Sequence, residues 1–171
     1  MIRRNFHRID VEDFRILYKT YVRPHMEYAV QSWLPYMVKD IQVLEKVQQR
    51  ATKCVTGLKN KTHHQRLKIL GIPSLELRRK TGDLIETCKI LTGKEDIDRD
   101  QLFQLTPNIH STRGHQLKLF KKPCLINVRK FFFSQRVVDS WHSLPSNVVE
   151  SPSINTFKNR PDDYISRNGR L

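Results

Sequence analysis

The lysines and arginines of this sequence are spaced in a way that suggests a role in binding anions. If residues 38–55 form a helix, then Lys39, Lys46, Arg50 and Lys53 fall within one narrow sector of it, at positions i, i+7, i+11 and i+14. Such a row can follow a phosphate backbone and displace its counterions without reading base sequence. The alternative interpretation is a solvated helix face, and the spacing alone does not decide between the two.

Further cations lie in three other segments that we expect to meet nucleic acid. Pro24 favours an elbow between two helices, and this elbow would present Arg23 and His25 to a phosphate. A second basic segment precedes Pro123, and a third lies on one side of a later helix. The predicted nucleic-acid-binding residues are Lys19, Arg23, His25, Lys39, Lys46, Arg50, Lys53, Lys118, Lys121, Lys122, Arg129 and Arg136.

The overall charge agrees with a polyanionic partner. The 171 residues include 31 Lys and Arg against 17 Asp and Glu, a formal net charge of +14. RNA, DNA or their hybrid is the expected partner, and no small-molecule substrate is expected. A membrane surface is the rival polyanion, but the sequence has no apolar run near the roughly 18 residues of a span and no signal-peptide core behind Met1. We therefore expect an intracellular chain, in the nucleus or the cytoplasm.

Acidic, thiol and imidazole groups do not indicate catalysis. Phosphoryl transfer to a nucleotide needs carboxylates that hold two metal ions about 4 Å apart, and the one adjacent pair, Asp162 and Asp163, follows Pro161 without a hydrophobic strand before it. The three cysteines form no C-x-x-C pair. His63 and His64 would point about 100° apart on a helix, which does not suit one metal ion. We expect no catalytic residue, no bound metal and no cofactor.

The first elements that must position the cations are two helices around Pro24. Asp10 is the expected N-cap of the first helix, and a second is expected from Pro24 to Trp33. Large rings at helical spacing usually fill a core, so we expect this of the aromatics from Phe14 to Trp33. Stacking of Tyr28 and Trp33 on bases is the alternative.

The clearest helical pattern runs from Val38 to Val55, with Gly57 where a C-terminal cap would stand. Thr62 and Gln65 predict a capping box for a short helix ending at Gly71. Another helix is expected to start at Pro73 and Ser74 and to end at Gly93. The arc expected to face the core from the first of these helices consists of Ile41, Val43, Leu44, Val47, Ala51, Cys54 and Val55.

The second half of the chain gives weaker patterns. Residues 115–119 alternate like a short strand and are expected to pair with residues 125–128 as a hairpin. Asn127 is the expected cap of a helix running to Trp141, apolar around most of its circumference and so suited to a core or an interface. Ser153 is expected to cap a last helix with Phe157 inward. The predicted fold is mainly α, a bundle of about six helices with a short β-hairpin near 115–128.

Several blocks, in one order, resemble the C-terminal region of the endonuclease/reverse transcriptases of non-LTR (LINE-type, jockey-like) retrotransposons. The resemblance spans roughly Arg4 to Arg160. The blocks are LYKTYVRPHMEYAVQSW, LEKVQQRATK, RLKILGIPSLELRRKTGDLIETCKIL, RGHQLKLF, VRKFFFSQRVVDSWHSLP and INTFKNR.

This resemblance implies a thumb-like helical region at 1–94, a linker at 95–114 and a C-terminal extension at 115–171. In the family such a region is expected to hold template RNA and the primed DNA end. Pro161 departs from the family, in which a helix continues after FKNR. The family's block of catalytic aspartates has no counterpart here, so we expect a fragment of a longer polymerase that is not itself an enzyme.

Two functional hypotheses follow. In the first, the chain is a module that binds nucleic acid non-specifically through basic helix faces, without polymerase activity. In the second, it is a helical interaction module that docks on another protein, such as the missing polymerase core, through the apolar 128–141 helix.

Overall fold

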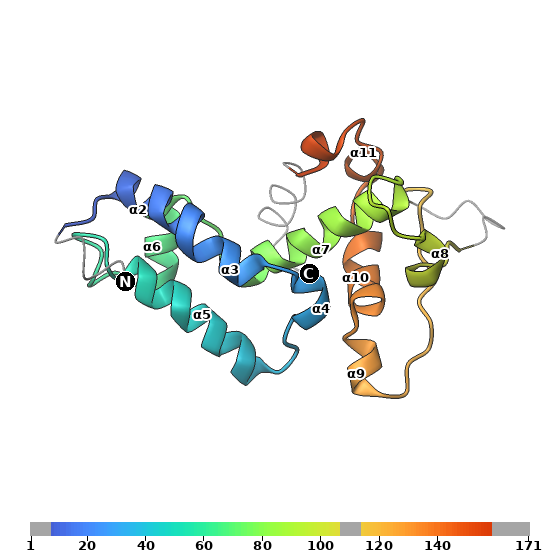
Figure 1. Ribbon diagram of the computed structural model, residues 1–171, viewed down its shortest axis with the longest axis horizontal. Helices are drawn as coiled ribbons and strands as arrows, with labels where there is room; N and C mark the ends of the chain where they lie inside the picture. Colours follow the sequence, from blue (N-terminus) through green and yellow to red (C-terminus); the bar gives the residue numbers. More distant parts are fainter. Residues whose placement is uncertain (1–7, 107–113, 159–171) are drawn as a thin grey trace. The chain divides into compact units, whose positions relative to one another are not determined.

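The computed structural model describes residues 8–106 and 114–158, and these residues are mainly helical, as the sequence predicts (Figure 1). The chain divides into two compact units, unit 1 (Met1–Arg79) and unit 2 (Lys80–Leu171). The elements are α2 (Val11–Leu17), a π-helical segment η1 (Tyr18–Val22), α3 (Arg23–Glu27), α4 (Val30–Trp33), α5 (Val38–Thr52), α6 (His63–Leu70), α7 (Leu75–Leu91), α8 (Arg99–Leu102), α9 (Asn127–Lys130), α10 (Phe133–His142) and α11 (Ser146–Val149).

The predicted count of about six helices is wrong, because the described residues contain ten α-helices. Five of them, α3, α4, α8, α9 and α11, have only four or five residues. A helix of little more than one turn shows no repeating apolar face, so periodicity does not reveal it. The division into units falls within α7, and it does not test the roles expected of regions 1–94 and 115–171.

The predicted hairpin near 115–128 is also wrong. The described residues contain no β-strand, and Leu119 forms an isolated antiparallel bridge with Leu105 instead. Leu119 is buried, and its N–H donates to Nε2 of His142 (3.0 Å). Leu125 is fully exposed and Ile126 largely so. The second half of the expected hairpin therefore has no buried face to stabilise a strand.

The core of unit 1 lies between helices of which α2 and α6 have the predicted caps, whereas α5 ends earlier than predicted, with Lys53 and not Gly57 as its C-cap. Asp10 caps α2 by accepting the N–H of Asp13 (2.8 Å). Thr62 and Gln65 form the predicted capping box of α6, and Gly71 ends that helix in the left-handed conformation (φ 60°). The core cluster consists of Ile9, Phe14, Tyr18, Val55, Leu58, Leu70 and Ile72.

The chain does not form the predicted elbow at Pro24; the helix ends after Glu27 instead. Helical backbone continues from α2 through η1 into α3, with the N–H of Arg23 donating to the carbonyl of Tyr18, five residues back. The wider π turn precedes Pro24, and the chain continues through the proline although it has no N–H to donate. Tyr28 is the C-cap of α3, and Ala29 adopts the left-handed conformation (φ 47°, ψ 34°) before α4.

Helix α5 faces the core with only part of the predicted apolar arc, because Val55 is in the core cluster and Ala51 and Cys54 pack against it. Its buried residues are Gln48 and Thr52, whereas Val43 is 58 % exposed and Val47 is 38 % exposed. The apolar arc was therefore misplaced for the two valines. Polar partners in other elements explain the difference: Gln48 Nε2 donates to the hydroxyl of Tyr18, and Thr52 Oγ1 accepts from Arg66 Nε, each at 3.0 Å.

Unit 2 packs around aromatic rings contributed by distant segments. Phe103 contacts Phe133 edge-on (centroids 5.6 Å apart), and Trp141 contacts both His115 (5.7 Å) and Phe157 (6.0 Å). Phe157 is fully buried, as predicted. The helix expected to run to Trp141 is two helices, α9 and α10, which are separated at residues 131–132 and drawn in orange in Figure 1. The predicted cap is also wrong, because Asn127 is the first residue of α9 and Ile126 is its N-cap.

Candidate nucleic-acid interface

The four cations of α5 and its C-cap form a single exposed row, which we call the α5 row. Lys39, Lys46, Arg50 and Lys53 are all exposed. None of them has an ion-pair partner among the residues that the structure describes. The predicted grouping of these side chains on one helix face is therefore present in the structure.

Two buried hydrogen bonds turn the α5 row toward solvent. Gln48 is 1 % exposed, and its Nε2 donates to the carbonyl of Pro73 (3.0 Å) as well as to Tyr18. Lys46 and Arg50 each lie two residues from Gln48, so they point about 200° away from it around the helix. The side of α5 that is held by hydrogen bonds thus lies opposite the side that carries the charge.

Arginines of unit 1 behave differently from the α5 row. Arg23 Nε and Arg78 Nη2 lie 2.9 Å and 3.2 Å from the carboxylate oxygens of Glu27. Arg79 is buried, with Nη2 3.9 Å from Glu45, and burial lowers the pKa of this guanidinium. These side chains are engaged within unit 1, so its cations separate into a structural set and an outward row.

The segment around Pro24 offers exposed groups beside a cavity that is too small for a phosphate. Lys19 and His25 are exposed, whereas Arg23 is half-buried against Glu27. The cavity that Lys19 and Arg23 help to line has a volume of about 10 Å³. That volume is enough for one water molecule, and a phosphate does not fit.

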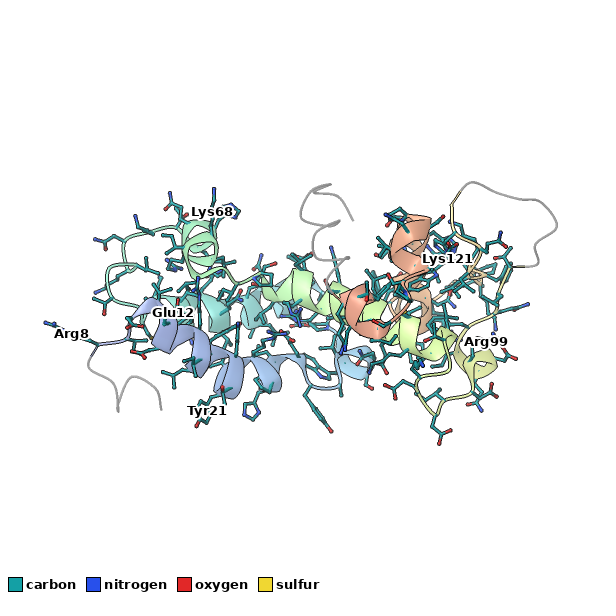
Figure 2. All side chains as sticks on the ribbon, turned by 90° about the horizontal axis from the view of Figure 1, so that it is seen from above. Arg8, Glu12, Tyr21, Lys68, Arg99 and Lys121 are labelled. Carbon is teal, nitrogen blue, oxygen red and sulfur yellow. The ribbon has the colours of Figure 1, made fainter. Side chains whose placement is uncertain are left out.

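Exposed rings in the first third of the chain were not predicted. Phe14 and Tyr18 fill the core as expected, but Tyr28 is 78 % exposed and Trp33 is 40 % exposed. Tyr21 also points outward from its helix (Figure 2). Trp33 Nε1 donates to the carbonyl of Tyr28 (2.5 Å), which fixes the indole beside the turn. The core prediction is therefore wrong for Tyr21, Tyr28 and Trp33, and no period in the sequence distinguishes these rings from the buried ones.

The predicted cations of unit 2 have mixed environments. Lys122 is exposed, whereas Lys121 pairs with Asp139 and Lys118 Nζ donates to the carbonyl of His142 (3.3 Å). The guanidinium carbon of Arg129 lies 5.3 Å from the ring centroid of Phe132.

Arg136 serves the packing of unit 2. It donates to both carboxylate oxygens of Asp83, from Nε (2.8 Å) and Nη2 (3.0 Å), and from Nη1 to the carbonyl of Phe131 (3.2 Å). Burial raises the pKa of Asp83, and the hydrogen bonds from Arg136 oppose that rise. The side chain that sequence reasoning missed is Lys130, an exposed cation that ends α9.

Metal and membrane features are absent from the described part of the chain. No three or more His, Cys, Asp or Glu side chains gather there in a group able to hold a metal ion. No helix in residues 8–106 or 114–158 is both long enough and apolar enough to cross a bilayer. Pro161, Asp162 and Asp163 lie outside the described residues.

Comparisons of the chain with models of protein families, with curated proteins and with solved structures give no match. The relation to retrotransposon polymerases therefore stays a prediction from the sequence blocks.

Proposed function

We propose that unit 1 binds nucleic acid through the α5 row, without sequence preference. The observation that supports this proposal is four exposed cations on one helix face with no acidic partner among the described residues. With a rise of 1.5 Å per residue, the row from Lys39 to Lys53 extends about 21 Å, enough to follow several consecutive phosphates. Lysine side chains suit this role because flexible ammonium groups neutralise phosphates without demanding a fixed geometry.

The resemblance to retrotransposon polymerases supports the same role. A thumb-like region would hold template RNA and the primed DNA end, and contact with the sugar-phosphate backbone is sufficient for that. Because the catalytic aspartate block has no counterpart in the sequence, the proposed activity is binding without strand synthesis.

The test is the salt dependence of binding to a fluorescent oligonucleotide. We expect log affinity to fall linearly with log salt concentration, by about 0.7 to 0.9 for each phosphate contacted. Lys46→Glu combined with Arg50→Glu should lower affinity and flatten this slope, because two contacts are lost and two like charges are added.

A matched control has the same change in charge at another place. Lys59→Glu combined with Lys68→Glu alters two exposed lysines of unit 1 outside α5; Lys68 is labelled on α6 in Figure 2. The control should bind nearly as the wild type does. Equal loss in both double variants, or equal affinity at about 50 and 500 mM salt, would contradict a binding site on α5.

A protein-docking role is the second candidate, and exposed apolar side chains near α9 favour it. The apolar face of α10, including Phe133, Val137 and Trp141, is buried and so does not offer a docking surface. The exposed apolar residues lie before it, at Leu125, Ile126, Val128 and Phe132. Val128→Asp should abolish self-association or capture of a polymerase core under this hypothesis, while leaving oligonucleotide affinity unchanged.

A further inference from the structure

A pocket in unit 2 gathers three lysines around a buried amide. Its volume is about 280 Å³, and it is lined by Lys121, Lys122, Pro123, Cys124, Lys130 and Gln135. The segment 121–124 leads to α9, Lys130 ends α9, and Gln135 lies in the first turn of α10 (Figure 1). Figure 2 labels Lys121 among the side chains of this region. Three short stretches of chain therefore converge on one concave site.

Gln135 is a buried polar side chain of this pocket that the described residues of unit 2 leave unpaired. The residue is 4 % exposed, and its Oε1 is buried without a hydrogen-bond partner. Its side chain makes no hydrogen bond to any other described residue. Buried amides are normally paired, and a carboxamide can turn by 180° to offer either its oxygen or its two N–H donors. A ligand in the pocket would accept from the amide N–H donors of Gln135, for which the described residues of unit 2 provide no acceptor.

The charges around the pocket select an anion. Lys122 and Lys130 have no acidic partner among the described residues, and only Lys121 is neutralised, by Asp139. Lys130 Nζ lies 6.0 Å from the ring centroid of Phe131, a contact that orients the ammonium without cancelling its charge. The positive end of the α10 dipole adds to the same potential, because Gln135 belongs to its first turn.

Phosphate fits these donors better than other anions do. Its tetrahedrally arranged oxygens can accept from two ammonium groups and an amide N–H at once. A carboxylate is better matched by the planar fork of an arginine, and no arginine lines this pocket. The pocket is close to the lower end, about 300 Å³, of sites that hold small organic ligands, so a phosphate with an attached group can enter.

We propose that this pocket is a binding site for a phosphate group, with Lys122 and Lys130 as the charged ligands and Gln135 as the neutral donor. Lys121, held by Asp139, and the apolar ring of Pro123 also line the pocket. The proposal does not rest on the α5 row, because different residues in a different unit form the site.

Cys124 provides a reporter inside the pocket, and Cys54, in unit 1, provides an internal reference. Both thiols are partly exposed, whereas Cys88 is buried. Alkylation of the full chain by iodoacetamide would be followed at each cysteine by peptide mass spectrometry, with increasing inorganic phosphate or a nucleoside 5′-monophosphate. With inorganic phosphate we expect saturable slowing at Cys124 and none at Cys54; because Cys54 follows Lys53 of the α5 row, it serves as the reference for inorganic phosphate only.

Two variants distinguish specific phosphate binding in the pocket from a non-specific effect of ionic strength on alkylation. Lys122→Gln combined with Lys130→Gln should raise the half-saturating phosphate concentration by about tenfold or more, since two charge-assisted hydrogen bonds are lost. Gln135→Glu keeps the shape of the side chain but adds a repelling charge, so protection should disappear. Unchanged emission of the buried Trp141 would show that each variant is folded. The proposal is overturned if Cys54 slows in parallel, if protection does not saturate, or if the double variant protects as the wild type does.

Short oligonucleotides would identify the source of the phosphate. Protection of Cys124 by a 5′-phosphorylated strand, but not by its 5′-hydroxyl form, would assign a terminal phosphate; equal protection would assign an internal phosphodiester. The variant with Lys46→Glu and Arg50→Glu should keep protection by inorganic phosphate. If phosphate fails to protect Cys124 while the salt-dependent oligonucleotide binding persists, only the pocket proposal falls.

Discussion

Gln48 connects three parts of unit 1 through one side chain. From α5 it donates to the Tyr18 hydroxyl of η1 and to the Pro73 carbonyl before α7, while almost fully buried. Burial raises the pKa of Tyr18 to about 12, so the phenol stays neutral near pH 7. A buried amide is useful here because apolar side chains could not satisfy the Pro73 carbonyl. The α5 row depends on this residue, since it fixes which side of the helix faces inward.

Substitutions at this contact should separate the loss of a hydrogen bond from the loss of packing. Tyr18→Phe removes one acceptor and leaves the Pro73 carbonyl as a partner of Gln48, so we expect a cost of about 1 kcal/mol. Gln48→Ala removes both hydrogen bonds and leaves a cavity, for about 3 kcal/mol. Urea unfolding would measure both. Exposed Gln42→Ala on the same helix should change stability by less than about 0.5 kcal/mol; a similar cost at all three positions would show that Gln48 has no special role.

His142 should make unit 2 less stable in acid. Its Nε2 accepts the N–H of Leu119, which requires a neutral ring, and burial lowers the pKa of His142. Lys118 and Lys121 act in the same direction, and Asp139 opposes them. Below about pH 6.5 the imidazole of His142 is protonated in the unfolded chain but stays neutral in the folded chain. The free energy of unfolding of unit 2 therefore decreases as the pH falls below that value.

Urea midpoints followed by Trp141 emission, at about pH 7.5 and pH 5.5, would test this. His142→Gln retains an acceptor and removes the titration, so it should reduce the loss of stability in acid. His25→Gln, at an exposed position, is the control and should leave the loss unchanged. A His142→Gln variant with the same acid sensitivity as the wild type would refute the assignment.

At the scale of elements, sequence predicted the features that depend on near neighbours in the chain. The Asp10 cap and the box of Thr62 and Gln65 were found because donor and acceptor lie three residues apart. The burial of Gln48 and Thr52 on α5 was missed because their partners, Tyr18 and Arg66, lie 30 and 14 residues away. The cations of the α5 row were grouped correctly because helical geometry alone places them together.

Replacing Ala29 by glycine should stabilise the turn between α3 and α4. Ala29 has φ 47°, a conformation that costs an L-residue about 1 kcal/mol or more. Ala29→Gly relieves this strain but increases the entropy of the unfolded chain, so we expect a net stabilisation of about 0.5 kcal/mol. Ala51→Gly, the same chemical change inside α5, should destabilise by about 1 kcal/mol. Thermal unfolding of both variants would check the opposite signs, and two destabilised variants would contradict the strain at Ala29.

At the scale of the whole molecule, each unit contains one of the two tryptophans. Trp33 in unit 1 is 40 % exposed, and Trp141 in unit 2 is fully buried. Their emission should differ in wavelength, because only Trp33 contacts solvent. Unfolding of the two units can therefore be followed separately in the unmodified chain.

The net charge of +14 should make salt act on folding and on binding in opposite directions. Folding compacts like charges, so screening by NaCl relieves repulsion, and the Debye length falls to about 10 Å at 0.1 M. Exposed ion pairs such as Lys121 with Asp139 lose strength in salt, but such pairs contribute only about 0 to 1 kcal/mol each. The buried pair of Arg136 with Asp83 is screened much less.

We therefore expect the urea midpoint to rise between about 50 and 500 mM NaCl while oligonucleotide affinity falls. Potassium glutamate in place of NaCl, at equal ionic strength, would separate screening from chloride binding. The variant with Lys46→Glu and Arg50→Glu has a net charge four units lower, because two positive charges are lost and two negative charges are added, so its folding should respond less to salt. A midpoint that falls with salt in the wild-type chain would mean that attractive pairs, rather than repulsion among the excess cations, dominate its electrostatics.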